Sequence, residues 1–144
     1  MNLTEHFNFS EATNTKHGDL ESMNRIQGSV YITDMRDLAV NVLEKIRAKY
    51  GPFKISSWFR GPALNKAVGG SPTSQHCKGQ AADLCRSDWT WEELDGVAKW
   101  IKNESGIMFG QVIRERDGER VWLHVSSGRK CEALDHDNVG YTAR

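Results

Sequence analysis

Two residues whose types suit metal chemistry lie close together in a stretch rich in small and polar residues. The segment SPTSQHCKGQAADL places His76 seven residues before Asp83, and a further histidine, His124, lies in the apolar run VWLHVSS. If the three side chains converge, two imidazoles and a carboxylate form a donor set that suits zinc and leaves a fourth position for water. Zinc lowers the pKa of such a water to about 7, which supplies hydroxide at neutral pH. Taken alone, the seven-residue spacing is a weak signal, and ordinary polar loop residues, with Gly79 in a tight turn, are the alternative interpretation.

An activated water also needs a proton acceptor and a group that holds charge on the substrate. The segment RERDGER supplies Glu115 and Glu119 as candidate proton acceptors, although a solvated hairpin tip would also explain both residues. Arg60, at the end of SSWFR, could hold a substrate carboxylate or the charge that develops on an oxyanion.

The remaining histidines and the cysteines do not extend this donor set. The other histidines lie in polar surroundings without partners at ligand spacing, and we interpret them as surface residues: His6, His17 and His136. The cysteines are odd in number and scattered, which favours free thiols over a disulfide framework or a thiolate zinc site: Cys77, Cys85 and Cys131.

Composition excludes several classes of function. The chain has 144 residues, with 19 basic and 19 acidic side chains, and this balance argues against a general nucleic-acid surface. No apolar stretch approaches the length of a membrane span, and the opening MNLTEHFNFSEA does not look like a secretory signal. We therefore expect one domain over residues 1–144, acting as a monomer, without a nucleic-acid or membrane partner.

The hydrophobic pattern predicts a mixed α+β fold in which helices flank a small, mostly antiparallel sheet. Thr33 or Asp34 can cap the first helix, and Thr90 with Glu93 forms a capping box for the last one. The amino-terminal segment and the polar tail from Gly128 carry weak signals, with at most one short strand in the tail. The expected elements are a helix over 33–50, a strand over 53–60, a helix over 61–68, a strand over 80–86, a helix over 90–103 and a hairpin over 108–127.

The hairpin decides how close Glu115 comes to the candidate ligands. A two-residue turn at Asp117-Gly118 pairs Gln111 with His124, whereas a three-residue turn shifts the register by one. In the first register Glu115 lies four residues beyond Gln111, about 13 Å along the strand at ~3.3 Å per residue, so the hairpin would have to bend over the site.

Three blocks of the sequence, in order, resemble one known family. SQHCKGQAAD matches the S-x-H-x-x-G-x-A-x-D signature of the zinc D-Ala-D-Ala carboxypeptidase family. This family includes L-alanyl-D-glutamate endolysins and vancomycin-resistance D,D-dipeptidases, with the hedgehog signalling domain as a distant fold relative. LTEHFNFSEAT resembles the opening of its small phage and bacterial branch, and FGQVIRERDGERVWLHVSS resembles its closing hairpin, with RDGER as a few extra residues.

The resemblance implies roles for particular residues. It implies that one zinc ion is held by His76, Asp83 and His124, and that Arg60 faces the substrate. The F-x-Q-x-I-x-E pattern of the family assigns the catalytic base to Glu115, with Glu119 as the alternative. The resemblance also implies supporting roles for Ser74 and Gln111, and we expect Trp122 to pack beside the site on the substrate side.

The resemblance also implies an activity. We expect a zinc peptidase that hydrolyses the stem peptide of bacterial peptidoglycan, either as a D,D-carboxypeptidase or as an endopeptidase. The absence of a visible export signal or wall-binding module favours a phage endolysin that collects in the host cytoplasm and reaches the wall after membrane permeabilisation. The alternatives are a zinc-stabilised binding module of the same fold that has lost catalysis, and a soluble α+β domain without catalytic function.

Overall fold

One mixed sheet forms the frame on which the candidate site is built. The structure is a computed structural model that describes residues 1–137 and 140–144. Neighbouring strands pair in the order β1-β2-β4-β3-β5-β6, and every pair is antiparallel except β3 with β5. This arrangement confirms the expected α+β class with a mostly antiparallel sheet. The strands are β1 (Lys54–Ser57), β2 (Ala81–Cys85), β3 (Gln111–Asp117), β4 (Arg120–Ser126), β5 (Glu132–His136) and β6 (Tyr141–Ala143).

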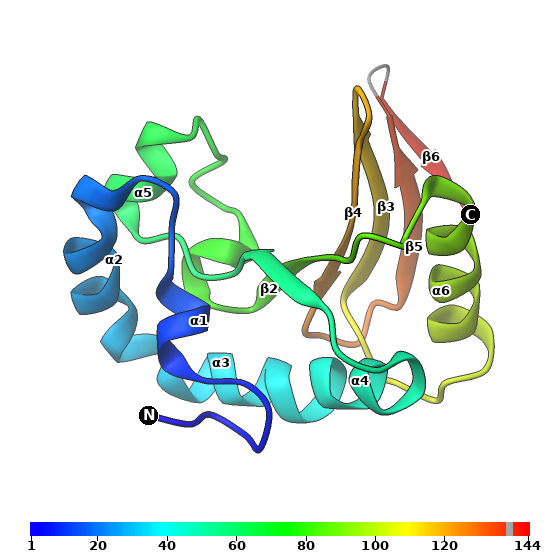
Figure 1. Ribbon diagram of the computed structural model, residues 1–144, viewed down its shortest axis with the longest axis horizontal. Coiled ribbons are helices and arrows are strands. Elements are labelled where there is room, and N and C mark those ends of the chain that lie inside the picture. The colour runs from blue at the N-terminus through cyan, green and yellow to red at the C-terminus, as the bar shows by residue number, and fades with distance from the viewer. Residues whose placement is uncertain (138–139) are drawn as a thin grey trace.

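The helices surround the sheet on three sides (Figure 1). The last helix lies beside the strands at the carboxyl-terminal end, the first two helices lie at the opposite end, and the helical run between residues 32 and 50 passes beneath the strands. The helices are α1 (Phe9–Thr13), α2 (Glu21–Gly28), α3 (Ile32–Leu38), α4 (Glu44–Tyr50), α5 (Pro62–Ala67) and α6 (Trp91–Asn103). The shorter turns are η1 (Gly18–Leu20), η2 (Ser29–Tyr31), η3 (Ala39–Leu43) and η4 (Gln75–Lys78).

The first predicted helix exists, but it is neither regular nor capped as expected. The segments α3 and α4 are joined by η3, which is a π-helical turn, and Gly51 ends the run with a φ of 84°. The prediction of Thr33 or Asp34 as its cap is wrong, because the chain enters α3 directly from the 3₁₀ turn η2. Helix α6 begins as predicted, since the hydroxyl of Thr90 accepts a hydrogen bond from the Glu93 N–H at 3.2 Å.

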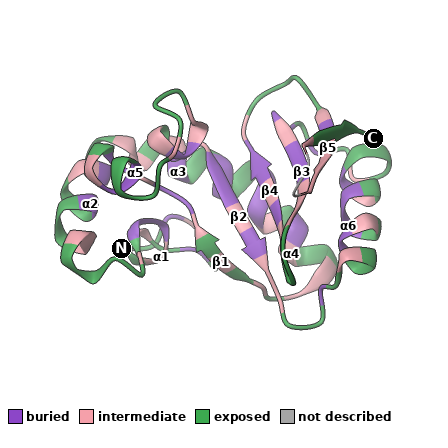
Figure 2. Ribbon diagram, turned by 90° about the horizontal axis from the view of Figure 1, so that it is seen from above, coloured by how far each residue is buried: buried purple, intermediate pink, exposed green. Residues whose placement is uncertain are grey.

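The core occupies one face of the sheet and leaves the other face for the site. Side chains alternate along a strand, so Leu123 and Val125 of β4 point to one face while Trp122 and His124 point to the other. The apolar stripe of α6 packs on the first of these faces. Figure 2 shows the buried residues concentrated along β2, β4 and the inner side of α6.

Both ends of the chain contain more structure than the sequence pattern indicates. The amino-terminal segment forms α1 and α2, and the tail forms two strands rather than one. Asn24 of α2 is buried, and its amide donates to the carbonyls of Thr13 and Phe59 at 2.8 and 3.1 Å. Short helices of this kind depend on tertiary contacts rather than on local propensity, which explains why the pattern is weak.

The part of the chain that the structure describes contains no helix long and apolar enough to cross a bilayer.

Candidate metal centre

The three candidate ligands, far apart in the sequence, meet at one point on the open face of the sheet. Asp83 of β2 and His124 of β4 are direct partners in the antiparallel register. The Nδ1 atom of His124 lies 3.1 Å from Oδ1 of Asp83, and Nε2 of His76 lies 3.4 Å from the same oxygen. One ligand atom from each residue falls within 4.8 Å of the others. A single cation could therefore contact all three side chains.

The loop before β2 holds His76 in a defined orientation. Ser74 caps η4, and its hydroxyl accepts a hydrogen bond from the His76 N–H at 3.2 Å. The His76 ring is buried, and its Nδ1 lies 2.6 Å from the carbonyl oxygen of Trp58, so Nδ1–H donates and the lone pair of Nε2 faces Asp83. Trp58 is 1% exposed, and its indole N–H donates to the Gly79 carbonyl at 3.0 Å.

The electrostatics of the cluster favour a bound cation. Burial by itself raises the pKa of Asp83, but the charges and hydrogen bonds of His76 and His124 outweigh it and hold the pKa far below its usual range. A buried carboxylate that stays ionised needs a positive partner, which protons on the imidazoles or a metal ion can supply. Two imidazole nitrogens and one carboxylate oxygen match the donor set of a catalytic zinc site, so the residues present fit this ion.

The hairpin brings Glu115 closer to the ligands than the predicted register does. The turn consists of Gly118 and Glu119, so Ile113 pairs with His124 and Glu115 pairs with Trp122. The predicted turn at Asp117-Gly118 is therefore wrong by one residue. A turn with glycine first needs a positive φ only at Gly118, which has a φ of 62°, whereas the predicted turn would impose one on the aspartate as well.

Glu115 is two residues along β3 from Ile113, the partner of His124, and its side chain lies on the same face of the sheet. This places Glu115 about 7 Å along the strand from the level of His124, at ~3.3 Å per residue. Its carboxylate accepts a hydrogen bond from the Trp122 indole N–H. Burial is the main cause that raises the pKa of Glu115, and the charge of Asp83 adds to it, while His124, Trp122 and His136 act in the opposite direction. Glu119 lies in the exposed turn.

Arg60 lines the cavity beside the site, and Ser74 contacts Arg60 from outside the cavity lining. The main-chain N–H of Arg60 donates to the His76 carbonyl at 3.0 Å, and Nη2 of its guanidinium lies 3.3 Å from the Ser74 hydroxyl. Within the described residues, the Nε atom of Arg60 is buried and has no hydrogen-bond partner. Arg60, Asp83 and Trp122 line one cavity of about 260 Å³. Gln111 does not line this cavity. It lies two residues further from the hairpin tip than Ile113, the partner of His124, and its side-chain amide donates to Glu132 at 2.7 Å.

Several residues near the site could not be found by spacing. Lys16, His17 and Arg120 line the same cavity, and His17 is exposed, as its interpretation as a surface residue predicts. His136, interpreted in the same way, is the β5 partner of Glu115 and stands in its row of the sheet. Each of these positions depends on long-range contacts, and the sequence contains no local signal for them.

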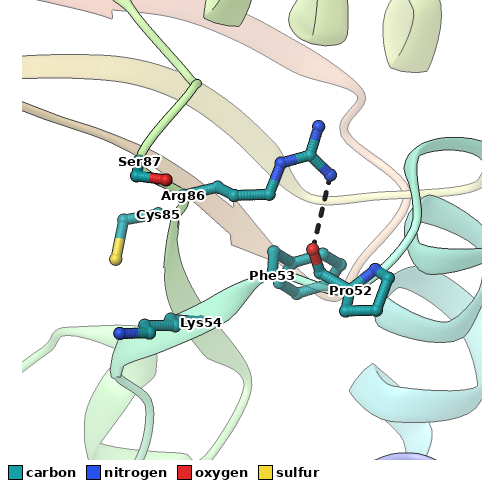
Figure 3. A pocket seen from close by; sticks show the side chains of 6 residues that line it. All are labelled: Pro52, Phe53, Lys54, Cys85, Arg86 and Ser87. Carbon is teal, nitrogen blue, oxygen red and sulfur yellow. Dashed lines mark hydrogen bonds between the residues drawn. The ribbon is translucent and has the colours of Figure 1, made fainter.

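A larger cavity lies elsewhere, at the edge of the sheet formed by β1 and the end of β2 (Figure 3). The Arg86 guanidinium lines this cavity but is already hydrogen-bonded within the protein. Its Nη1 donates to the carbonyls of Tyr50 and Pro52 at 2.6 and 3.3 Å, and its Nε donates to Asp88 at 2.6 Å. None of the three candidate metal ligands contributes to it. This cavity of about 570 Å³ is lined by Pro52, Phe53, Lys54, Cys85, Arg86 and Ser87.

Comparison with known proteins matches a family of peptidases to the segment that contains the candidate metal centre. A search of curated proteins returned no match to this chain. The model of the peptidase M15 family matches residues 14–126, a segment that contains all three candidate ligands, Arg60 and Glu115. The match covers most of the chain and ends before β5 and β6. The chain therefore belongs to the peptidase M15 family of zinc peptidoglycan peptidases.

Proposed function

We propose that this protein is a zinc-dependent peptidase that hydrolyses the peptide moiety of bacterial peptidoglycan, with residues 1–144 as its catalytic domain. The observation that carries the proposal is the convergence of His76, Asp83 and His124 beside a cavity. Membership of the peptidase M15 family supports both the metal and the substrate class. In this proposal the three side chains hold one zinc ion.

Zinc bound by these residues would supply a Lewis acid for the scissile carbonyl and a water of lowered pKa. Glu115 accepts the proton of that water and delivers it to the leaving amine. Its raised pKa suits this exchange, because a base that also serves as an acid works best when its pKa approaches the working pH. The hydrogen bond from Trp122 orients the Glu115 carboxylate towards the ligand side of the sheet.

Arg60 binds a carboxylate of the substrate or the charge that develops on the carbonyl oxygen. The contact with Ser74 restrains its guanidinium, and the buried Nε has a hydrogen bond still to donate. Gln111 is proposed to act in support from the neighbouring row, because its main-chain N–H is tied to Ser126 and its side chain to Glu132.

We further propose that the enzyme acts as an endolysin in phage-induced lysis of the host cell. The amino-terminal block and the hairpin, which resemble the small phage and bacterial branch, support this setting. Expression in the bacterial cytoplasm should leave cells intact until a holin permeabilises the membrane, and turbidity should then fall. Lysis without permeabilisation, or no lysis after it, would contradict this role.

The experiment that tests the enzymatic proposal compares Glu115→Gln with Glu119→Gln on purified peptidoglycan. Zinc-loaded wild-type protein should release peptide fragments, whose masses identify the bond that is cut. Glu115→Gln should lower the rate by about 10² to 10⁴-fold, the usual contribution of a general base, and should still bind one zinc per chain. Glu119→Gln is the matched control and should retain the wild-type rate.

Other outcomes have defined meanings. Zinc binding without any hydrolysis by the wild-type protein would reject the peptidase and favour a zinc-stabilised binding module of the same fold. A loss of rate in Glu119→Gln with full activity in Glu115→Gln would transfer the base to the turn. Absence of zinc affinity would leave an α+β domain without the proposed chemistry.

A further inference from the structure

The cavity beside the candidate metal centre is lined by cations that form no ion pair within the described part of the chain. Lys16, Arg60 and Arg120 all contribute to its wall, together with His17. Across the described residues, 1–137 and 140–144, none of the three cations takes part in an ion pair. The acid in this wall is Asp83, which is already engaged by the candidate ligand histidines. The wall therefore carries a positive charge that nothing in the described chain neutralises.

These cations come from separate parts of the fold and so reach different parts of a bound molecule. Arg60 follows β1, and Lys16 and His17 lie in the loop between α1 and η1. Arg120 begins β4 at the hairpin tip and also contributes to the cavity wall. It shares a sheet face with Trp122, because the two are separated by one residue, and its guanidinium carbon lies 5.5 Å from the Trp122 ring centroid.

The hairpin tip connects Arg120 with the reacting part of the site. Arg120 follows the turn at Gly118 and Glu119 and is the first residue of β4. Through Trp122, whose indole contacts the Glu115 carboxylate, Arg120 is connected to the proposed base. A substrate group bound by Arg120 would thus lie beside the reacting part of the cleft and not on a remote surface.

The chemistry of the lining selects an anionic ligand. A cleft lined by one sign of charge concentrates the opposite charge, and a guanidinium binds a carboxylate through two parallel hydrogen bonds. Arg60 alone suffices for one carboxylate, and a zinc ion held by His76, Asp83 and His124 would polarise the scissile carbonyl. Lys16, His17 and Arg120 remain for a second anionic group on the same substrate.

We propose that Lys16, His17 and Arg120 form a second carboxylate-binding subsite, which selects peptides that carry a free carboxylate in addition to the one bound by Arg60. This inference rests on the proposed function, and it narrows the substrate class to acidic stem peptides. A peptide whose glutamyl α-carboxylate is free is a substrate of this class, and the same peptide with that carboxylate converted to an amide is not.

The test compares these two synthetic peptides, identical except for the free or amidated glutamyl carboxylate. Binding is measured by calorimetry on the zinc-loaded Glu115→Gln variant, in which bound peptide is not consumed. The free carboxylate should bind about tenfold more tightly than the amide, as expected for a lost charge-assisted contact. Adding Arg120→Gln should reduce this preference to about twofold, and adding Lys16→Gln should reduce it in the same direction.

Arg116→Gln is the matched control, because Arg116 lies on the same hairpin but faces the Trp91 ring on the other side of the sheet, 4.2 Å away. It should keep the tenfold preference. In the active enzyme, Arg120→Gln should raise KM for the free peptide and leave kcat unchanged. Arg120 is exposed, so the variant is expected to fold, and circular dichroism checks this.

Failure of this inference can be separated from failure of the proposed function. Equal binding of the two peptides, or a full preference retained in both Arg120→Gln and Lys16→Gln, would overturn the second subsite even if peptidoglycan is hydrolysed. Absence of hydrolysis by the wild-type enzyme would reject the peptidase, and the binding preference would still decide whether the cationic wall recognises a second carboxylate.

Discussion

Replacing Gly79 by alanine tests how the loop that carries His76 is held against the core. Gly79 ends η4 with a φ of 69°, and its N–H donates to the His76 carbonyl at 3.2 Å. A Cβ at this position would lie 2.9 Å from Cγ of Met35, a core residue that is 0% exposed. The substitution therefore imposes both a left-handed backbone on a residue with a side chain and an overlap with a packed methionine.

The two costs can be estimated separately. A left-handed conformation costs a non-glycine residue about 1–2 kcal/mol. Forcing an extra carbon into a packed core costs about 1–3 kcal/mol, because neighbouring side chains leave their preferred rotamers. We expect Gly79→Ala to lower the free energy of unfolding by roughly 3 kcal/mol, which corresponds to a fall in Tm of about 10 °C for a domain of this size.

Two glycine variants separate these contributions. Gly118 has a φ of 62°, and a Cβ added to it would meet no atom within 4 Å, so Gly118→Ala should show the backbone cost alone, about 1–2 kcal/mol. Gly96 lies inside α6 with nothing within 4 Å, so Gly96→Ala should stabilise the protein by about 0.5–1 kcal/mol.

Chemical denaturation of the metal-free variants measures these differences. A competition titration with a chelator should also show weaker zinc binding in Gly79→Ala and unchanged binding in Gly118→Ala, because only Gly79 adjoins the turn that presents His76. If Gly79→Ala costs no more than Gly118→Ala, the contact with Met35 is not a real constraint. If Gly79→Ala does not lower the free energy of unfolding at all, the left-handed backbone at this position does not require glycine.

Three further predictions concern the site and its supports. Ser74→Ala removes the acceptor of the His76 N–H and should lower the free energy of unfolding by about 1 kcal/mol in denaturant titrations, with a wild-type value arguing against the cap. Chelation should lower Tm in calorimetry, because zinc at 100 times its Kd adds about 2.7 kcal/mol to the folded state, and an unchanged Tm would contradict folding-linked binding. Burial raises the pKa of Glu44, but contact with Thr4 and the hydrogen bonds from His6 outweigh it and lower the pKa, so this carboxylate stabilises the fold above the ordinary pKa of about 4.3 and less as the pH falls. Glu44→Gln should therefore cost more stability at pH ~7 than at pH ~3 when unfolding is measured at both, and equal costs would refute the assignment.

Local patterns in the sequence predicted much of the fold. The stripe of α6, its cap at Thr90 and the hairpin are confirmed, because residues close together in the chain determine each of them. Local patterns could not place α2, whose buried Asn24 is satisfied by groups distant in the sequence, namely the carbonyls of Thr13 and Phe59 and the N–H of Gly61. The same holds for β5, which pairs in parallel with β3 and so gains its hydrogen bonds from a separate strand.

The candidate site divides in the same way. The residue types and order of His76, Asp83 and His124 could be read from the sequence, because donor chemistry belongs to single side chains. The tertiary fold sets the distances between these residues and the orientation of the His76 ring on the Trp58 carbonyl. Strand pairing also sets the register in which Glu115 lies two residues along β3 from the partner of His124.

The side chains that can bind a metal, the start of the strongest helix and the class of fold all follow from the amino-acid sequence. The turn at Gly118, the pairing of Glu115 with Trp122 and the position of Lys16 and Arg120 around one cavity follow only from the folded chain. Donor type and helical periodicity are local properties, which is why the sequence shows them. Register and cavity walls, by contrast, are set when distant segments compete to bury the same apolar surface and satisfy the same hydrogen bonds.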